Sequence, residues 1–159
     1  MSLNNLSSLT VLITKTFRKI ETRLKKEQPY NSNCNAGNTV VTDGELRDLS
    51  GIFGETLDRA AEIILNGSIK LYKRQVNNRT IIEIAGSNDS VYRFFPNTNY
   101  CPCEAYQYHV LKSRSEYTCK HILAAKIALL CLDHRIVTEV MPDAQFNVIV
   151  ESITATGFK

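Results

Sequence analysis

Four side chains that favour zinc stand in two close pairs along this chain of 159 residues. Cys101 and Cys103 form a C-x-C pair, and Cys119 and His121 form a C-x-H pair further along. Thiolate sulfur and imidazole nitrogen suit Zn²⁺, which takes four ligands in a tetrahedron. The two pairs together therefore predict one zinc ion that clamps two short segments of chain.

The neighbouring residues suit this geometry. Pro102 fixes φ between the first two thiols, where the backbone must fold sharply for both to face one ion. The run I-L-A-A-K-I-A-L-L after the second pair is a strong helix former, which places that pair at a helix start. Three Cys and one His close the ligand shell, whereas a catalytic zinc keeps one position open. We therefore expect a structural zinc, with His109 as a rival fourth ligand and Cys34 as a conceivable extra one.

The elements that must hold these ligands predict an α+β fold, a small antiparallel three-stranded β-meander packed with helices. Apolar residues recur at three- and four-residue steps over 3–27. Thr42 and Glu45 form a capping box, and Gly54 predicts a break in the helical segment that follows. Alternation with period two predicts strands. The expected helices are 3–27, 42–53, 55–66, 104–112 and 119–133. The expected strands are 68–75, 80–85 and 91–95. Residues 143–152 are expected to form a short helix or a strand.

The chain divides into four stretches. Residues 1–41 are an amphipathic helix and an Asn-rich linker, and 42–96 hold helices and the meander. Residues 97–135 form the finger with a helix that is apolar nearly all round, and 136–159 form a C-terminal helix and tail. We expect 42–152 to be one compact domain.

Charge and cysteine usage narrow the functional classes. The net charge is only +3, and the basic surplus lies within residues 1–30. A polybasic nucleic-acid binder has a different composition, so any such contact must come from a local patch. Five cysteines do not form a full disulfide framework. With no leader or membrane span recognised, we expect a reducing compartment, cytosol or nucleus.

The two pairs, with Ala124 three residues after His121, resemble the SWIM zinc finger. The runs I-F-G-E-T-L-D-R-A-A, G-S-I-K-L-Y, C-P-C-E-A-Y-Q-Y-H-V-L-K-S and C-K-H-I-L-A-A resemble the small Sws-type SWIM proteins of Shu complexes. Those proteins are accessory factors of homologous recombination. The resemblance covers about residues 44–152 and is most specific from Cys101 to Ala125.

The resemblance implies a nuclear, non-enzymatic subunit that pairs with a RecA-like recombinase paralogue and promotes recombinase filaments on single-stranded DNA. Part of the apolar helix after the second pair would then be covered by the partner, and its candidate docking residues are Ile122, Leu123, Ala124, Ile127 and Leu130.

A direct nucleic-acid-binding module is the alternative, with single-stranded or branched DNA as its ligand. Basic residues on the first hairpin and around the finger are its candidate phosphate contacts, although such residues are also the normal solvent coat of a domain. They are Lys70, Lys73, Arg74, Lys112, Arg114 and Lys120.

Several enzyme signatures are absent from the sequence. It has no Gly-rich phosphate loop, no G-x-S-x-G and no H-E-x-x-H. Glu104 stands beside the finger, but the H-x-E and P-C-x-x-C order of the zinc deaminases is missing. Four protein ligands would also leave no position for an attacking water. We therefore expect no enzymatic activity.

Overall fold

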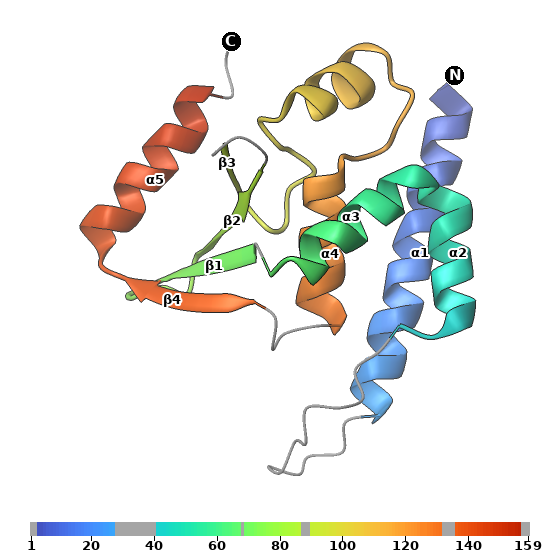
Figure 1. Ribbon diagram of the computed structural model, residues 1–159, viewed down its shortest axis with the longest axis horizontal. Helices are drawn as coiled ribbons and strands as arrows, with labels where there is room; N and C mark the ends of the chain where they lie inside the picture. Colours follow the sequence, from blue (N-terminus) through green and yellow to red (C-terminus); the bar gives the residue numbers. More distant parts are fainter. Residues whose placement is uncertain (1–2, 28–40, 68, 87–89, 132–135, 157–159) are drawn as a thin grey trace.

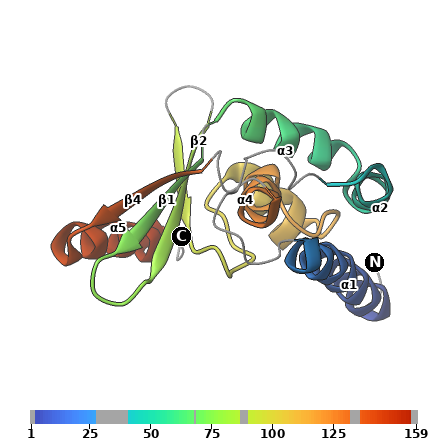
Figure 2. The same ribbon diagram turned by 90° about the horizontal axis from the view of Figure 1, so that it is seen from below.

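A computed structural model describes residues 3–27, 41–67, 69–86, 90–131 and 136–156. Its centre is a four-stranded sheet, with helix α5 (Asp143–Thr156) on one face and the other helices on the opposite face (Figure 2). The α+β class is the predicted one. In the part of the chain that is described, no helix is both long enough and apolar enough to cross a membrane.

The helices begin and end where the sequence indicates. Helix α1 runs over Leu3–Glu27, as predicted. Thr42 accepts a hydrogen bond from the backbone N–H of Glu45, whose carboxylate accepts one from the backbone of Thr42, so the capping box before α2 (Asp43–Phe53) is confirmed. Gly54, at φ 50°, separates α2 from α3 (Glu55–Leu65). A left-handed φ suits glycine, so the break falls at this residue.

The sheet follows the predicted meander and extends it. Strands β1 (Ile69–Arg74), β2 (Thr80–Ala85) and β3 (Val91–Phe94) pair in antiparallel fashion. A fourth strand, β4 (Val137–Met141), lies parallel to β1 at the sheet edge, giving the order β3-β2-β1-β4.

The sheet therefore has one strand more than predicted, and that strand lies in the stretch 136–159, for which the sequence indicated a helix and tail. Strand β4 is missed because its side chains are almost all exposed and show no apolar face. The strand is held mainly by backbone pairing with β1, which is distant in sequence. Local periodicity does not indicate such pairing. Helix α5 then covers the region for which the sequence left helix and strand open.

Two groups of buried side chains lie on the two faces of the sheet. The larger includes residues of α1, α2, α3 and the finger, together with Ile69, Leu71, Ile82, Ile84 and Phe94 of the sheet. The smaller consists of Tyr72 and Ile81 from the sheet and Phe146 and Ile153 from α5. Helix α1 thus packs into the same core as the elements that hold the finger (Figure 1). The Asn-rich linker over 28–40 and the tail over 157–159 lie outside the described residues.

Candidate metal centre

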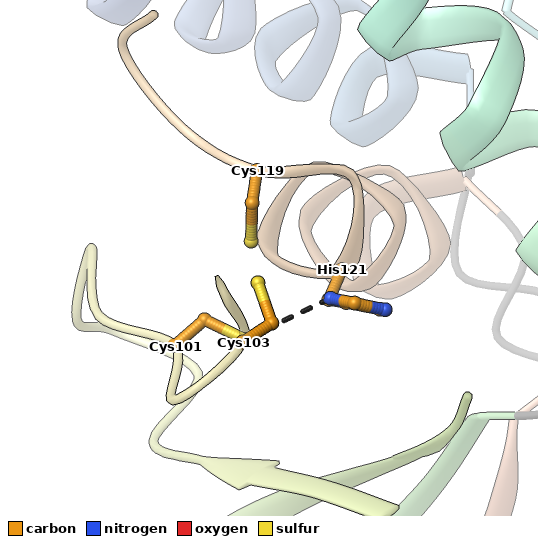
Figure 3. A group of neighbouring side chains, drawn as sticks. All are labelled: Cys101, Cys103, Cys119 and His121. Carbon is orange, nitrogen blue, oxygen red and sulfur yellow. Dashed lines mark hydrogen bonds between the residues drawn. The ribbon is translucent and has the colours of Figure 1, made fainter. Parts of the chain in front are cut away.

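The four predicted zinc ligands converge on one point. Cys101 and Cys103 lie on the loop after β3, and Cys119 and His121 lie at the start of helix α4 (Lys120–Cys131) (Figure 3). All four are buried, and their ligand atoms lie within 4.8 Å of one another. Two segments separated by η1 (Tyr106–Lys112) therefore meet at a single cluster.

The distances fit one tetrahedral ion. In a tetrahedron, atoms bound to one Zn²⁺ at about 2.3 Å for sulfur and about 2.0 Å for nitrogen lie roughly 3.5–3.8 Å apart. Cys101 Sγ and His121 Nδ1 are 3.8 Å apart. A Cys₃His set is a structural zinc set, and the cluster fits one structural zinc ion.

Neighbouring groups hold these ligands in place. The backbone N–H of Tyr106 donates to Cys103 Sγ over 3.4 Å, which fixes the thiol at the start of the turn into η1. The Tyr106 hydroxyl donates in turn to the Asn99 carbonyl before the first pair. The Tyr92 ring lies 4.3 Å from the ring of His121, centroid to centroid. Such outer contacts orient metal ligands.

Tyr92 was not singled out from the sequence as part of the site. The only local sign is its place in β3, where period-two alternation puts it on a defined face of the strand. Segment η1 is a π-helix, whereas the sequence predicted only a short helix over 104–112. In this segment Tyr106 is buried, Val110 is half-buried and Leu111 is exposed.

The electrostatics of the cluster call for a cation. Hydrogen bonds with Cys103 and Cys119, together with burial, raise the pKa of the Cys101 thiol far above its ordinary value. The protein alone therefore disfavours three thiolates at this point. Zn²⁺ would supply the positive charge that stabilises the thiolates, and metal binding would release their protons.

Comparison with known families decides what this cluster is. The family model described as the SWIM zinc finger matches residues 93–130, the span from β3 through most of α4. This chain contains a SWIM zinc finger. The four clustered residues, which the two sequence pairs singled out, all lie within the matched span.

Several proteins that are similar to this chain are named for a SWIM zinc finger. Human and mouse proteins named zinc finger SWIM domain-containing protein 7 are each 27% identical to this chain, over 88 and 90 residues. These matches cover 55% and 57% of this chain, and the chain spans only 62% and 59% of the two relatives. A Dictyostelium discoideum homolog is 25% identical over 120 residues, 76% of each chain. No solved structure gave a significant match.

The two other candidate ligands fare differently. The ring of His109 lies outside the SWIM cluster, with Nδ1 3.3 Å from the Ser115 hydroxyl oxygen. Cys34 lies outside the described residues.

The residues predicted to dock a partner have another role in this structure. Ile122, Leu123, Ala124 and Ile127 are buried in the chain's own core, and Leu130 is half-buried against it. Helix α3 packs along α4, and residues of α1 and the sheet belong to the same core. The expectation that a partner covers this apolar helix is therefore corrected for those four residues, because the chain itself covers them.

The six candidate DNA contacts fall into two parts of the fold, β1 and the segment around η1 and the start of α4. Two of those on β1 have carboxylate partners: Lys70 Nζ lies 3.9 Å from Glu139, and Arg74 makes a two-pronged pair with Asp143 at 3.0 and 3.2 Å. The remaining residues are Lys73, Lys112 and Arg114, which are exposed, and Lys120, which is half-buried. The structure does not bring the six into one patch.

Proposed function

We propose that this chain is a non-enzymatic, zinc-binding subunit of a recombination-accessory complex of the Shu type. In this proposal it pairs with a RecA-like recombinase paralogue, which supplies the ATPase fold, and the pair promotes recombinase filaments on DNA in the nucleus. The support is the resemblance of residues 44–152 to Sws-type proteins and the SWIM match over residues 93–130. The chain spans only 62% and 59% of the human and mouse relatives, so the role of the whole protein is a proposal.

The burial of the ligands supports a structural zinc and not a catalytic one. All four ligand residues are at most 4% exposed, and together they supply the four ligands of a tetrahedral shell. A zinc held in this way has no position for water or substrate, so its effect is on structure. Zinc binding contributes about 10–16 kcal/mol in small fingers, which rivals the whole stability of a domain. The metal would therefore set the shape of the surface that a partner meets.

The test separates zinc binding from partner binding. We expect Cys119→Ser and His121→Ala each to release the zinc and to abolish co-purification of the RecA-like partner. His109→Ala is the matched control, because this histidine lies outside the cluster and should keep one equivalent of zinc and the partner. Cys34→Ser and Cys131→Ser should also leave one equivalent of zinc.

The readouts are metal analysis of the purified chain and mass spectrometry of the proteins that co-purify from the native cell. Zinc loss with the partner retained would contradict the idea that the finger shapes the docking surface. Retention of a partner with no RecA-like fold would contradict the recombination role while leaving the structural zinc intact.

A direct nucleic-acid-binding module is a second candidate, and α1 favours it. Lys15, Arg18 and Lys26 line one surface hollow of this helix together with Lys19 and Arg23. The last two also pair with α2, through Asp48 and Glu45 respectively. A phosphate-binding face would make DNA affinity fall steeply with added salt. We expect Lys15→Gln with Arg18→Gln to reduce that salt dependence if α1 contacts DNA, and to leave it unchanged otherwise.

A further inference from the structure

A pocket opens beside the SWIM finger, between α1, α4 and the two loop segments that lead into the ligand pairs. Its volume is about 290 Å³. Its apolar walls come from Ile13 and Phe17 of α1, Phe53 of α2 and Leu123 of α4. Its other lining residues are mostly polar, and they include Asn97, Thr98, Asn99, Thr118 and Lys126. Binding sites usually combine apolar walls with a few convergent polar groups.

Thr118 contributes a hydroxyl that lacks a partner. The residue is 4% exposed, and its Oγ1 is the only buried side-chain nitrogen or oxygen without a hydrogen bond among the residues that the structure describes. Leaving such a group unpaired costs about 1–3 kcal/mol. A valine would fill the same space without that cost. The oxygen itself has almost no exposed surface, so a turn of the Thr118 side chain about its Cα–Cβ bond would have to present it to a group that arrives from outside the chain.

Lys126 contributes a cation to the same pocket. Its Nζ lies 4.5 Å from the centroid of the Phe17 ring, a cation–π distance. Lys126 is exposed, although partial desolvation by its neighbours lowers its pKa, and no carboxylate pairs with it in the described part of the chain. An ammonium with an aromatic ring below it and no counter-ion is ready to accept an anion.

The available polar groups define the ligand. The Asn99 side chain already donates to the Tyr117 carbonyl, and Thr98 Oγ1 donates to the Phe95 carbonyl. Of the other polar groups in the lining, the Thr118 hydroxyl is buried and the Lys126 ammonium is charged, and both can donate to a carboxylate. Since the pocket is at the lower end of the range for ligand sites, it suits one or two side chains better than a nucleotide.

We propose that this pocket docks a short acidic–apolar segment of the partner protein. An apolar side chain of that segment enters between α1 and α4, and a neighbouring Asp or Glu carboxylate accepts hydrogen bonds from Thr118 and Lys126. The inference rests on the proposed function, because it names the chemistry by which that partner is held. Thr118 directly precedes the ligand Cys119, so a metal-loaded finger also holds the pocket's hydroxyl in position.

The first experiment tests the pocket chemistry without any partner. The full chain, zinc-loaded and ¹⁵N-labelled, is titrated by NMR with phenylacetate, which carries one ring and one carboxylate. We expect saturating shift changes at amides lining the pocket, and weaker binding of the neutral phenylacetamide. Thr118→Val and Lys126→Gln should each weaken phenylacetate binding roughly tenfold, the scale of a hydrogen bond to a charged group. Arg79→Gln, which removes an exposed cation in the connection between β1 and β2, is the matched control and should bind phenylacetate normally.

The Thr118→Val variant also distinguishes loss of the hydroxyl from loss of the fold. Because it has the shape of threonine and removes an unpaired hydroxyl, Thr118→Val should keep one equivalent of zinc and an unfolding temperature at least equal to that of the unsubstituted chain. Equal affinity for phenylacetate and phenylacetamide would overturn the proposal. Shift changes that map outside the pocket, or undiminished phenylacetate binding by both variants, would do so as well.

The second experiment separates the pocket from the proposed function. Thr118→Val and Lys126→Gln chains are compared with the Arg79→Gln chain for capture of the RecA-like partner. Loss of capture at full zinc content supports the pocket as the docking point. Unchanged capture overturns the docking proposal while the proposed function stands. If no RecA-like partner is captured by any chain, the proposed function fails, and the phenylacetate titration still decides whether the site binds a carboxylate.

Discussion

The two faces of the sheet are covered by cores of different composition. On the face that carries the finger, Cys101, Cys103 and Cys119 are part of the buried core itself, beside aliphatic residues of four helices. On the other face, Tyr72, Ile81, Phe146 and Ile153 form a small cluster under α5 that contains no metal ligand. Figure 2 shows the two sides with the sheet between them.

This difference indicates where the fold depends on a cofactor. The loop between β3 and α4 holds only one π-helical segment, and its ends meet at the ligand cluster. Without a metal, apolar burial alone must hold three thiols together there, and hydrogen bonds with its neighbours together with burial disfavour the charged form of Cys101. Helix α5 instead docks by ordinary packing and one ion pair, Arg74 with Asp143. The finger side should therefore respond to zinc, and the α5 side should respond to packing.

The largest expected effect is that of zinc removal. A chelator that strips the ion at neutral pH should destabilise the protein by an amount on the order of 10 kcal/mol. Hydrogen exchange should accelerate most for the amides of α4, since its first turn carries two of the ligands. The amides of α5 should keep more of their protection, because Phe146 and Ile153 pack without the finger.

Hydrogen exchange with mass spectrometry on loaded and stripped protein makes this measurement. Re-adding zinc is the control, and it should restore the original pattern. An equal loss of protection in α4 and α5 would show that the two faces unfold as one unit, which would remove the distinction between them.

Loss of the Phe146 ring should have a smaller effect on the other face. This side chain is 1% exposed, and Arg74 lies over its ring with the guanidinium carbon 5.9 Å from the centroid. We expect Phe146→Ala to lower the free energy of unfolding by about 3–5 kcal/mol. Zinc content should stay at one equivalent, because no ligand touches this cluster.

Chemical denaturation and metal analysis report the two quantities. Val148→Ala is the matched control on α5, since Val148 is 66% exposed and its loss should change the stability by less than about 0.5 kcal/mol. A Phe146→Ala chain that also loses zinc would mean that α5 supports the finger through the sheet.

The sequence was informative where local signals decide the structure. The ligand pairs, the capping box at Thr42 and the break at Gly54 each depend on a few adjacent residues, and all are found as predicted. The strands of the meander were also predicted, because alternation and turn residues lie within each segment.

Longer-range features could not be predicted in this way. Strand β4 depends on pairing with β1 across most of the chain, and its own five residues carry no apolar stripe. The apolar helix α4 predicted burial correctly but not what buries it, since periodicity cannot tell a partner from the chain's own α1 and α3. The pocket with Thr118 and Lys126 forms only where segments from four regions of the chain meet.

The smallest effect concerns a contact on the finger side that needs no metal. Arg23 of α1 donates two hydrogen bonds to the Glu45 carboxylate of α2, at 2.8 and 2.7 Å. With the backbone N–H of Thr42 as a further donor, these bonds lower the pKa of Glu45 from 4.5 to about 2. A lowered pKa contributes stability that is present above pH 4.5 and is lost as the pH falls towards 2.

Glu45→Gln should therefore be less stable than the unsubstituted chain by roughly 2 kcal/mol at pH 7, and the gap should narrow below about pH 4.5. Urea unfolding of both chains over pH 7 to 3 measures the gap, and since both chains lose zinc in acid, that loss cancels in the difference. Glu21→Gln removes an exposed partner of Lys25 on the same helix and should show no such gap. If the difference in unfolding free energy between the Glu45→Gln chain and the unsubstituted chain stays constant with pH, packing and not the charged pair joins α1 to α2.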